Sequence, residues 1–307
     1  MSIAVHIPFY NQEPYKKEGF RQLTRFDYLL ENIDNLKKFP IKTNIFIHTH
    51  NNFLNNKILN AEIIIHNISN DDLEKGYLTW RVRSLMEKHL GNYEYYIYLE
   101  HDIKFTKENF EYWLEYKKKI KNNNLNLGFV IYENNNEKKS NYAVHTMKKF
   151  FKYIVIENQK YFINDFENYC CFWLYNKKIF NNFLNTKFWS FEKKLTNFRH
   201  NYGITERSAL GLHAISCNYF KATLIPEINF KPDPDCFIEH ITNNYFNKYQ
   251  DENKKNLNDI RGVCKFNLNE IVSETKNQKE IKDNFYMIKY FKILLWKFRF
   301  LTRLVKK

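Results

Sequence analysis

Three residues suited to chemistry directly follow an apolar run: Glu100, His101 and Asp102 come after YYIYL at 95–99. The aromatic and β-branched run is typical of a buried strand. Glu100 and Asp102 are two positions apart, so their side chains point the same way in an extended segment. Mg²⁺ is usually bound by one or two carboxylates together with ligand phosphates. The run therefore predicts a metal site with room for a diphosphate, and the alternative is a solvated strand end with a helix-capping acid.

The elements around this run decide whether its acidic residues can bind a ligand, because ligands of open α/β sheets bind outside the carboxyl ends of strands. The predicted strands of the first half are Ser2–Ile7, Thr43–His48, Ala61–His66, Glu94–Leu99 and Leu127–Tyr132. The predicted helices are Phe20–Lys38, Asp71–Leu90 and Lys107–Lys121, with Asp71 and Thr106 as N-caps of the last two. This alternation indicates an α/β fold with a mostly parallel sheet flanked by helices.

The second half of the sequence is less regular. A hairpin is predicted at Tyr153–Ile163, with its turn at Glu157 and Asn158, and an apolar strand at Tyr169–Tyr175. Further predicted elements are the helices Lys177–Leu184 and Thr205–Cys217 and the strand Ala222–Ile228. The stretch Asn247–Lys282 is polar and shows no strong period.

Composition bounds the class of protein. The 307 residues carry a formal charge of +14, which favours anionic partners such as nucleic acid, an acidic membrane or a phosphorylated substrate. The five cysteines are odd in number and form no C-x-x-C, so a reducing compartment is favoured over a disulfide framework. The first residues lack the pattern of a signal peptide, and no apolar stretch of about 18 residues is present. A cytoplasmic location is therefore expected.

The run at 95–103 resembles the D-x-D element of GT-A-fold glycosyltransferases, with Glu100 and Asp102 at its acidic positions. The resemblance implies a Rossmann-like GT-A sheet and a nucleotide-sugar donor, with a metal ion that stabilises the charge of the departing diphosphate. The preceding stretch LTWRVRSLMEKH resembles the nucleotide-side helix of that fold. Arg81, Arg83 and His101 are therefore donor-binding candidates, since Arg is a forked phosphate donor. A solvated basic face is the alternative for the two arginines.

Two later positions of the same family are matched in order. The resemblance implies a histidine that completes the metal shell, and His240 in CFIEHITNNY fits that place. Because imidazole suits Mn²⁺, the expected cofactor is Mn²⁺ or Mg²⁺. The resemblance also implies a catalytic base that opens a helix, and Glu206 fits, taking the proton of the acceptor hydroxyl. The alternative is a first-turn acid that complements the helix dipole, with Thr205 as a nearby cap.

Aromatic residues suggest two further contacts. Pro8, Phe9 and Tyr10 end the first strand, where the nucleotide base sits in the GT-A fold, and they are candidates for a base pocket. Ordinary loop packing explains them as well. Trp189 belongs to the aromatic and basic stretch FWSFEKKLTNFR and is a candidate for contact with the acceptor sugar, although core packing explains this stretch equally.

The C-terminal segment FYMIKYFKILLWKFRFLTRLVKK at 285–307 places apolar residues on one helical face and Lys and Arg on the other. A basic amphipathic helix suits an anionic bilayer, and the alternative is a helix docked on the main domain. Three parts are thus predicted: a GT-A-like catalytic domain at 1–245, a polar, partly helical extension at 246–284 and a membrane-associating helix at 285–307.

These features together predict a metal-dependent glycosyltransferase, with an inverting mechanism preferred and a retaining mechanism as the alternative. It would move a sugar from a UDP- or GDP-type donor to a glycan or lipid-linked acceptor in surface polysaccharide or lipopolysaccharide biosynthesis, on the inner face of the cell membrane. A nucleic-acid-binding protein is the second hypothesis. Dispersed basic residues and the lack of an RNA-binding signature weigh against it, so no nucleic-acid partner is expected. A catalytically inactive GT-A-like glycan-binding scaffold is the third hypothesis.

Overall fold

The computed structural model describes residues 1–12, 16–18, 21–52, 60–121, 124–135, 139–146, 148–165, 169–190, 203–213, 219–243, 245 and 266–282. The predicted membrane-associating helix at 285–307 lies outside the described residues.

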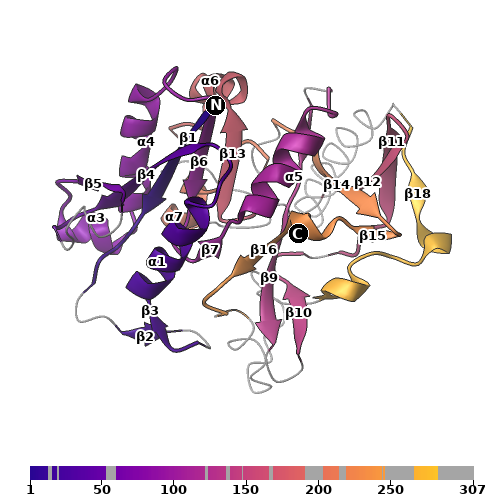
Figure 1. Ribbon diagram of the computed structural model, residues 1–307, viewed down its shortest axis with the longest axis horizontal. Coiled ribbons are helices and arrows are strands. Elements are labelled where there is room, and N and C mark those ends of the chain that lie inside the picture. The colour runs from indigo at the N-terminus through magenta and orange to yellow at the C-terminus, as the bar shows by residue number, and fades with distance from the viewer. Residues whose placement is uncertain are drawn as a thin grey trace, which may run out of the picture.

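A five-stranded main sheet forms one half of the structure (Figure 1). In spatial order its strands are β13 (Phe172–Asn176), β6 (Tyr95–Leu99), β1 (Ser2–Pro8), β4 (Lys42–Thr49) and β5 (Glu62–Ile65). All neighbours pair in parallel except β13, which runs antiparallel to β6. Helix α4 (Leu78–Lys88) packs against β1 and β4, and α6 (Lys177–Leu184) packs against β13 and β6. The predicted α/β class, with a Rossmann-like, mostly parallel sheet flanked by helices, is confirmed by this arrangement.

Two further sheets form the other half. The first has the order β17 (Phe266–Asn267), β10 (Ser140–Ala143), β9 (Val130–Asn135), β16 (Phe237–His240) and β7 (Ile103–Lys104). The second has the order β15 (Lys231–Pro232), β14 (Ala222–Ile228), β12 (Gln159–Asn164), β11 (Lys152–Ile156) and β18 (Lys279–Glu280), and β8 (Leu125–Leu127) pairs with β14. Since β7 follows β6 after three residues, the chain passes from the main sheet into the second half at Glu100–Asp102.

Several predicted elements match the structure closely. Helix α6 has the predicted bounds, and so does strand β14. The predicted hairpin is formed by β11 and β12, with Glu157 and Asn158 at positive φ in its turn. Helix α5 (Lys107–Lys117) starts after Thr106, whose side chain accepts a hydrogen bond from the Asn109 amide, as a helix N-cap does.

Four predicted helix features are wrong. Helix α1 (Arg25–Leu36) begins later than Phe20, because Thr24 forms a capping box with Asp27. The predicted helix Asp71–Leu90 is two helices, α3 (Asn70–Glu74) and α4, separated by a turn with Gly76 at φ +85°. Ser69, and not Asp71, caps α3. The predicted helix Thr205–Cys217 is described only as the short α7 (Ile204–Ser208), with Gly203 at its N-cap position in place of Thr205.

The strand predicted at Leu127–Tyr132 is also wrong, since it is two strands in different sheets. Strand β8 ends at Leu127 and pairs with β14, whereas β9 begins at Val130 and pairs with β10 and β16. Gly128 lies at the break, where an added Cβ would contact the Thr223 side chain at 2.8 Å. The close approach of β14 at this point explains why the residue at the break is glycine.

Three histidine rings lie in a row across β1, β4 and the end of β5. His6 Nδ1 lies 3.0 Å from His48 Nε2, and His48 Nδ1 lies 2.8 Å from His66 Nε2. Burial, followed by the neighbouring imidazoles, holds the pKa of both His6 and His48 well below the ordinary value. These two buried rings are therefore neutral in the folded protein.

The free energy of unfolding is expected to decrease as the pH falls below about 6.5. In that range an unfolded histidine binds a proton and the buried His6 and His48 do not, so the unfolded state gains protons and stability falls with pH. Each unit by which a folded pKa is lowered corresponds to ~1.4 kcal/mol. Urea titrations near neutral pH and near pH 5 measure the difference. His6→Gln, which cannot titrate, should show a smaller difference, and an undiminished one would contradict the assignment.

Candidate active site

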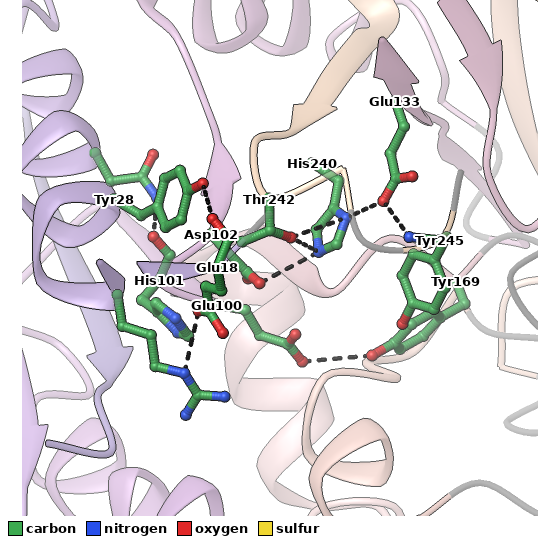
Figure 2. A network of polar contacts seen from close by, with 12 residues as sticks. Glu18, Tyr28, Glu100, His101, Asp102, Glu133, Tyr169, His240, Thr242 and Tyr245 are labelled. Carbon is green, nitrogen blue, oxygen red and sulfur yellow. Dashed lines mark hydrogen bonds and ion pairs between the residues drawn. The ribbon is translucent and has the colours of Figure 1, made fainter. Parts of the chain in front are cut away.

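Glu100 and Asp102, labelled in Figure 2, lie where the chain passes from β6 into β7. Strand β7 pairs with β16 in antiparallel register, so that His240, the last residue of β16, is opposite Ile103. The turn after β16 is held to the same place, because the Ile241 amide donates to the Asp102 carbonyl at 3.0 Å. Asp102 and His240, which are 138 positions apart in sequence, thereby become neighbours.

His240 lies between two carboxylates, as Figure 2 shows. Its Nε2 is 3.2 Å from Asp102 Oδ2, and its Nδ1 is 2.5 Å from Glu133 Oε1. Burial alone would lower the pKa of His240, but the negative charges of Asp102 and Glu133 outweigh burial and raise it to about 10. The two carboxylates thus stabilise a positive charge on the His240 ring, next to Asp102.

Glu100 lies in an excess of negative charge. Burial raises its pKa well above the ordinary value, and the charges of Asp102 and Glu206 raise it further. At Asp102 burial also favours the neutral form, but His101 and His240 hold its pKa below the ordinary value. The Tyr169 hydroxyl donates to Glu100 Oε1 at 3.4 Å. The carboxylates of Glu100, Asp102 and Glu206 therefore repel one another at this corner, and an additional positive charge would reduce that repulsion.

Backbone strain accompanies the cluster. Cys171 and Asn243 both have positive φ, at 54° and 53°, a backbone conformation that residues other than glycine seldom adopt. The Cys171 carbonyl accepts a hydrogen bond from the Glu100 amide, and the Asn243 amide donates to the His240 carbonyl. Strained residues of this kind are concentrated at functional sites, where the surrounding structure supports them.

Glu206 is brought to the cluster by the anchoring of α7. Trp80 Nε1 donates to the Ile204 carbonyl at 2.8 Å, and the Tyr98 hydroxyl lies 2.7 Å from Ser208 Oγ. The Glu206 carboxylate lies over Gly203, where an added Cβ would collide with it. The position of Glu206 in the first turn of α7 also suits the helix dipole, so both roles considered for it are compatible with its placement.

Arg83 has a structural position that the donor-binding prediction did not foresee. Its guanidinium is buried and donates to the carbonyls of Phe188, Trp189 and Ser208. It also lies 4.1 Å from the Trp80 ring centroid. The forked donors that were expected to bind phosphate are thus used to hold α7 and residues 188 and 189. Arg81, by contrast, is half exposed, with Asp72 at 3.8 Å.

Trp189 is likewise packed in the core. It is only 9% exposed, and its ring makes edge contacts with Phe180 and Phe183 at centroid distances of 5.6 and 5.2 Å. Its Nε1 donates to Glu87 at 3.4 Å. This geometry corresponds to the core-packing alternative and gives no surface for an acceptor sugar.

The predicted base-pocket residues divide into buried and half-exposed ones. Pro8 and Phe9 are buried, and the Phe9 ring meets His101 edge-on at 5.6 Å. Burial lowers the pKa of His101, whose carbonyl accepts from Asn32. Tyr10 is half exposed beside His50, at a centroid distance of 5.3 Å. Pro8 and Phe9 are therefore packing residues beneath the surface. Of the three candidates, Tyr10 is the one whose ring is accessible.

The strand ends also bring together polar residues that the sequence did not single out. Asn11 follows β1 and donates to Asn51 Oδ1, after β4, at 3.0 Å. Glu133, Thr242 and Tyr245 surround His240, with Thr242 Oγ1 3.1 Å from its Nε2. One signal could have found Glu133: like Glu100, it is an acid that follows an apolar run, FVIY at 129–132. Thr242 and Tyr245 have no comparable signal.

The donor set fits a divalent cation that is shared with a ligand. Within the described ranges, no three His, Cys, Asp or Glu side chains form a group that could hold a metal ion by themselves. The carboxylates of Glu100 and Asp102 are hard oxygen donors, and the pKa of Glu100 is raised first by burial and then by the negative charges of Asp102 and Glu206. Mg²⁺ and Mn²⁺ accept such incomplete protein shells, because water and phosphate oxygens supply the remaining ligands. Asp102 and, through Nε2, His240 are adjacent and would hold the ion, and Glu100 is a further carboxylate of the same corner.

Comparisons with known proteins give matches among solved structures. No protein-family model matches the chain, and no curated protein matches it. Among solved structures, S. aureus TarS 1–349 matches with 10% identity and a TM-score of 0.40, over 76% of this chain and 59% of that one. The CMP:2-keto-3-deoxy-manno-octonic acid synthetase complexed with CTP matches with 11% identity and a TM-score of 0.33, over 60% of this chain and 78% of that one. The chain thus spans less than two thirds of the TarS chain.

The fold and the site define the class of protein. It is an α/β protein with a Rossmann-like, mostly parallel main sheet, and its acidic cluster lies at the carboxyl end of β6, where α/β folds bind ligands.

Proposed function

We propose that this chain is a metal-dependent glycosyltransferase that uses a nucleotide-sugar donor of the UDP or GDP type. The observation that carries the proposal is the convergence of Glu100, Asp102, His240 and Glu206 from three separate segments at the carboxyl end of β6. An acidic corner with surplus negative charge suits a cation and a diphosphate more than a structural role, since a structural cluster would be balanced by arginine or lysine.

In the proposed reaction Asp102 and Glu100 would hold the cation that binds the donor diphosphate. When bound, Mn²⁺ or Mg²⁺ supplies charge stabilisation for the departing nucleoside diphosphate. His240 completes the ligand set from the opposite strand, and Tyr169 orients Glu100 through its hydroxyl. Tyr10, at the end of β1, is the accessible aromatic residue for the nucleotide base.

Glu206 is proposed as the general base of an inverting displacement. Its carboxylate takes the proton of the acceptor hydroxyl as that oxygen attacks the anomeric carbon and the diphosphate departs from the opposite face. The influence of Glu206 on the pKa of Glu100 supports this role, because it requires the two carboxylates to be close. Arg83, Trp80 and Tyr98 contribute by holding α7 in place.

A donor screen tests the proposal. Purified chain is incubated with UDP- and GDP-sugars, with and without Mn²⁺, and the release of UDP or GDP is followed by mass spectrometry. Metal-dependent release from one donor is the expected result, and titration calorimetry should show tighter nucleotide binding when Mn²⁺ is present. Nucleotide binding that does not depend on metal, or no binding at all, would favour the inactive scaffold.

The acceptor is proposed to be a glycan or a lipid-linked intermediate of surface polysaccharide or lipopolysaccharide assembly. None of the helices in the described ranges is long and apolar enough to cross a membrane. A peripheral location on the inner face of the cell membrane is proposed from the segment 285–307. This segment is rich in cationic and aromatic residues and contains no acidic residue. Each cation near an anionic surface contributes about 1 kcal/mol.

Deletion of 285–307 is expected to release the protein from vesicles that contain anionic lipid. Removing the segment takes away all of its cations and its apolar face, and sedimentation with vesicles should fall by at least ~10-fold. Donor hydrolysis should stay unchanged, which controls for folding of the shortened chain. Vesicle binding that persists after the deletion would show that another surface makes the contact.

A further inference from the structure

Glu133 is a fully buried carboxylate that has no direct part in the proposed reaction. It belongs to β9, which pairs in parallel with β16 in a register that runs from Phe237 opposite Val130 to Glu239 opposite Tyr132. The next residues of the two strands are His240 and Glu133. Their side chains therefore leave adjacent strands on the same side of the sheet.

Several hydrogen bonds connect β9 to the turn that follows β16. Glu133 Oε1 accepts from His240 Nδ1 at 2.5 Å and from the Tyr245 amide at 3.1 Å. The Asn134 amide, one residue further, donates to Asn243 Oδ1 at 3.0 Å. The carboxylate is thus held at a fixed place on β9, and the imidazole is held against it.

These contacts determine which edge of the His240 ring faces the candidate metal site. A carboxylate can only accept, so Nδ1 carries the hydrogen of that bond. Nε2 is the ring nitrogen that faces Asp102, at 3.2 Å from Oδ2. Because the Asp102 carboxylate is also an acceptor, Nε2 carries a hydrogen too in this structure, and a bound cation would take the place of that hydrogen. Histidines that bind metals commonly donate their other N–H to a carboxylate, which fixes both the tautomer and the orientation of the ring.

We propose that Glu133 is a positioning residue, which holds His240 so that Nε2 faces a divalent cation shared with Asp102. The inference rests on the proposed function, because it requires a cation at that corner. It assigns a role to a residue on a strand outside the main sheet, more than thirty positions after the acidic run at 100–102.

The test is the affinity of the full chain for Mn²⁺, measured by titration calorimetry and by the EPR spectrum of the bound ion. Glu133→Gln keeps the volume and an acceptor oxygen, whereas Glu133→Ala removes both. Loss of such a partner typically weakens metal affinity by about 10- to 100-fold. We expect a loss near the lower figure for Gln and near the upper figure for Ala, with an altered EPR spectrum in both.

Glu239→Gln is the matched control. Glu239 directly precedes His240 on β16, but its carboxylate lies 3.6 Å from Lys104 Nζ, away from the ring. It should bind Mn²⁺ as the wild type does. Thermal unfolding of each variant separates folding from metal binding, and if Glu133→Ala does not fold, Glu133→Gln carries the test.

Two results would overturn the inference, and they differ from each other. Wild-type affinity in both Glu133 variants, together with weakened binding in His240→Ala, removes the positioning role and leaves the proposed function intact. Absence of Mn²⁺ binding by the wild type, with UDP and GDP present or not, overturns the proposed function itself and the positioning role with it.

Discussion

Asp102→Asn is expected to abolish metal-dependent donor hydrolysis, with a loss of ~10³-fold or more in turnover. The substitution keeps the size of the side chain but removes the charge that would bind the cation and that now lies 3.2 Å from His240 Nε2. A cation at a departing diphosphate stabilises the transition state by several kcal/mol, and about 4 kcal/mol corresponds to ~10³-fold in rate. Release of UDP or GDP, followed at saturating Mn²⁺, measures the effect.

The control for this substitution is Asp34→Asn, which makes the same chemical change on α1. Asp34 is exposed and lies 3.1 Å from Lys37 Nζ, so hydrolysis should stay at the wild-type rate. Titration calorimetry should show that Asp102→Asn also loses the Mn²⁺ dependence of nucleotide binding. Unchanged turnover in Asp102→Asn would remove the metal assignment.

Glu206→Gln is expected to keep donor binding while transfer to the acceptor falls by about 10²- to 10⁴-fold, the usual contribution of a general base. Gln retains the shape of the side chain over Gly203 but cannot take the acceptor proton. Metal-dependent donor binding should persist, because Glu206 is not among the proposed cation ligands. Transfer to the cognate acceptor and calorimetric donor binding, measured on the same preparation, separate the two effects.

A second first-turn acid provides the control for the helix-dipole alternative. Glu108 occupies the first turn of α5, as Glu206 does in α7, and the charges that act on it are those of Lys107 and Lys38. Glu108→Gln should therefore change stability by no more than ~1 kcal/mol and leave transfer unchanged. If Glu206→Gln behaves in the same way, Glu206 is a helix-terminus acid and another group must be the base.

Local patterns in the sequence correctly predicted most of the elements that carry the site. The apolar run at 95–99 is β6, and Glu100–Asp102 follow it at the carboxyl end of the main sheet. Thr106 caps α5, and α6 and β14 have the predicted bounds. Each of these depends on side-chain periodicity or on a capping hydrogen bond within a few residues, which adjacent positions suffice to specify.

Predictions failed where a distant part of the chain decided the outcome. The strand expected at Leu127–Tyr132 divides because β14 pairs with its first part and β16 with its second. Arg83 resembles a phosphate-binding residue in sequence, yet the carbonyls of residues 188, 189 and 208 surround its guanidinium. A forked donor binds whichever acceptors the fold places in reach, and the sequence does not show which those are.

The sequence by itself determined that acidic side chains end a buried strand of an α/β protein, because the strand pattern and its termination are local properties. Only the tertiary structure decided that His240 and Glu206 reach those acids and that Glu133 orients His240. The reason is that these contacts depend on the register between β9, β16 and β7 and on the anchoring of α7. Both are set by packing between segments more than a hundred residues apart.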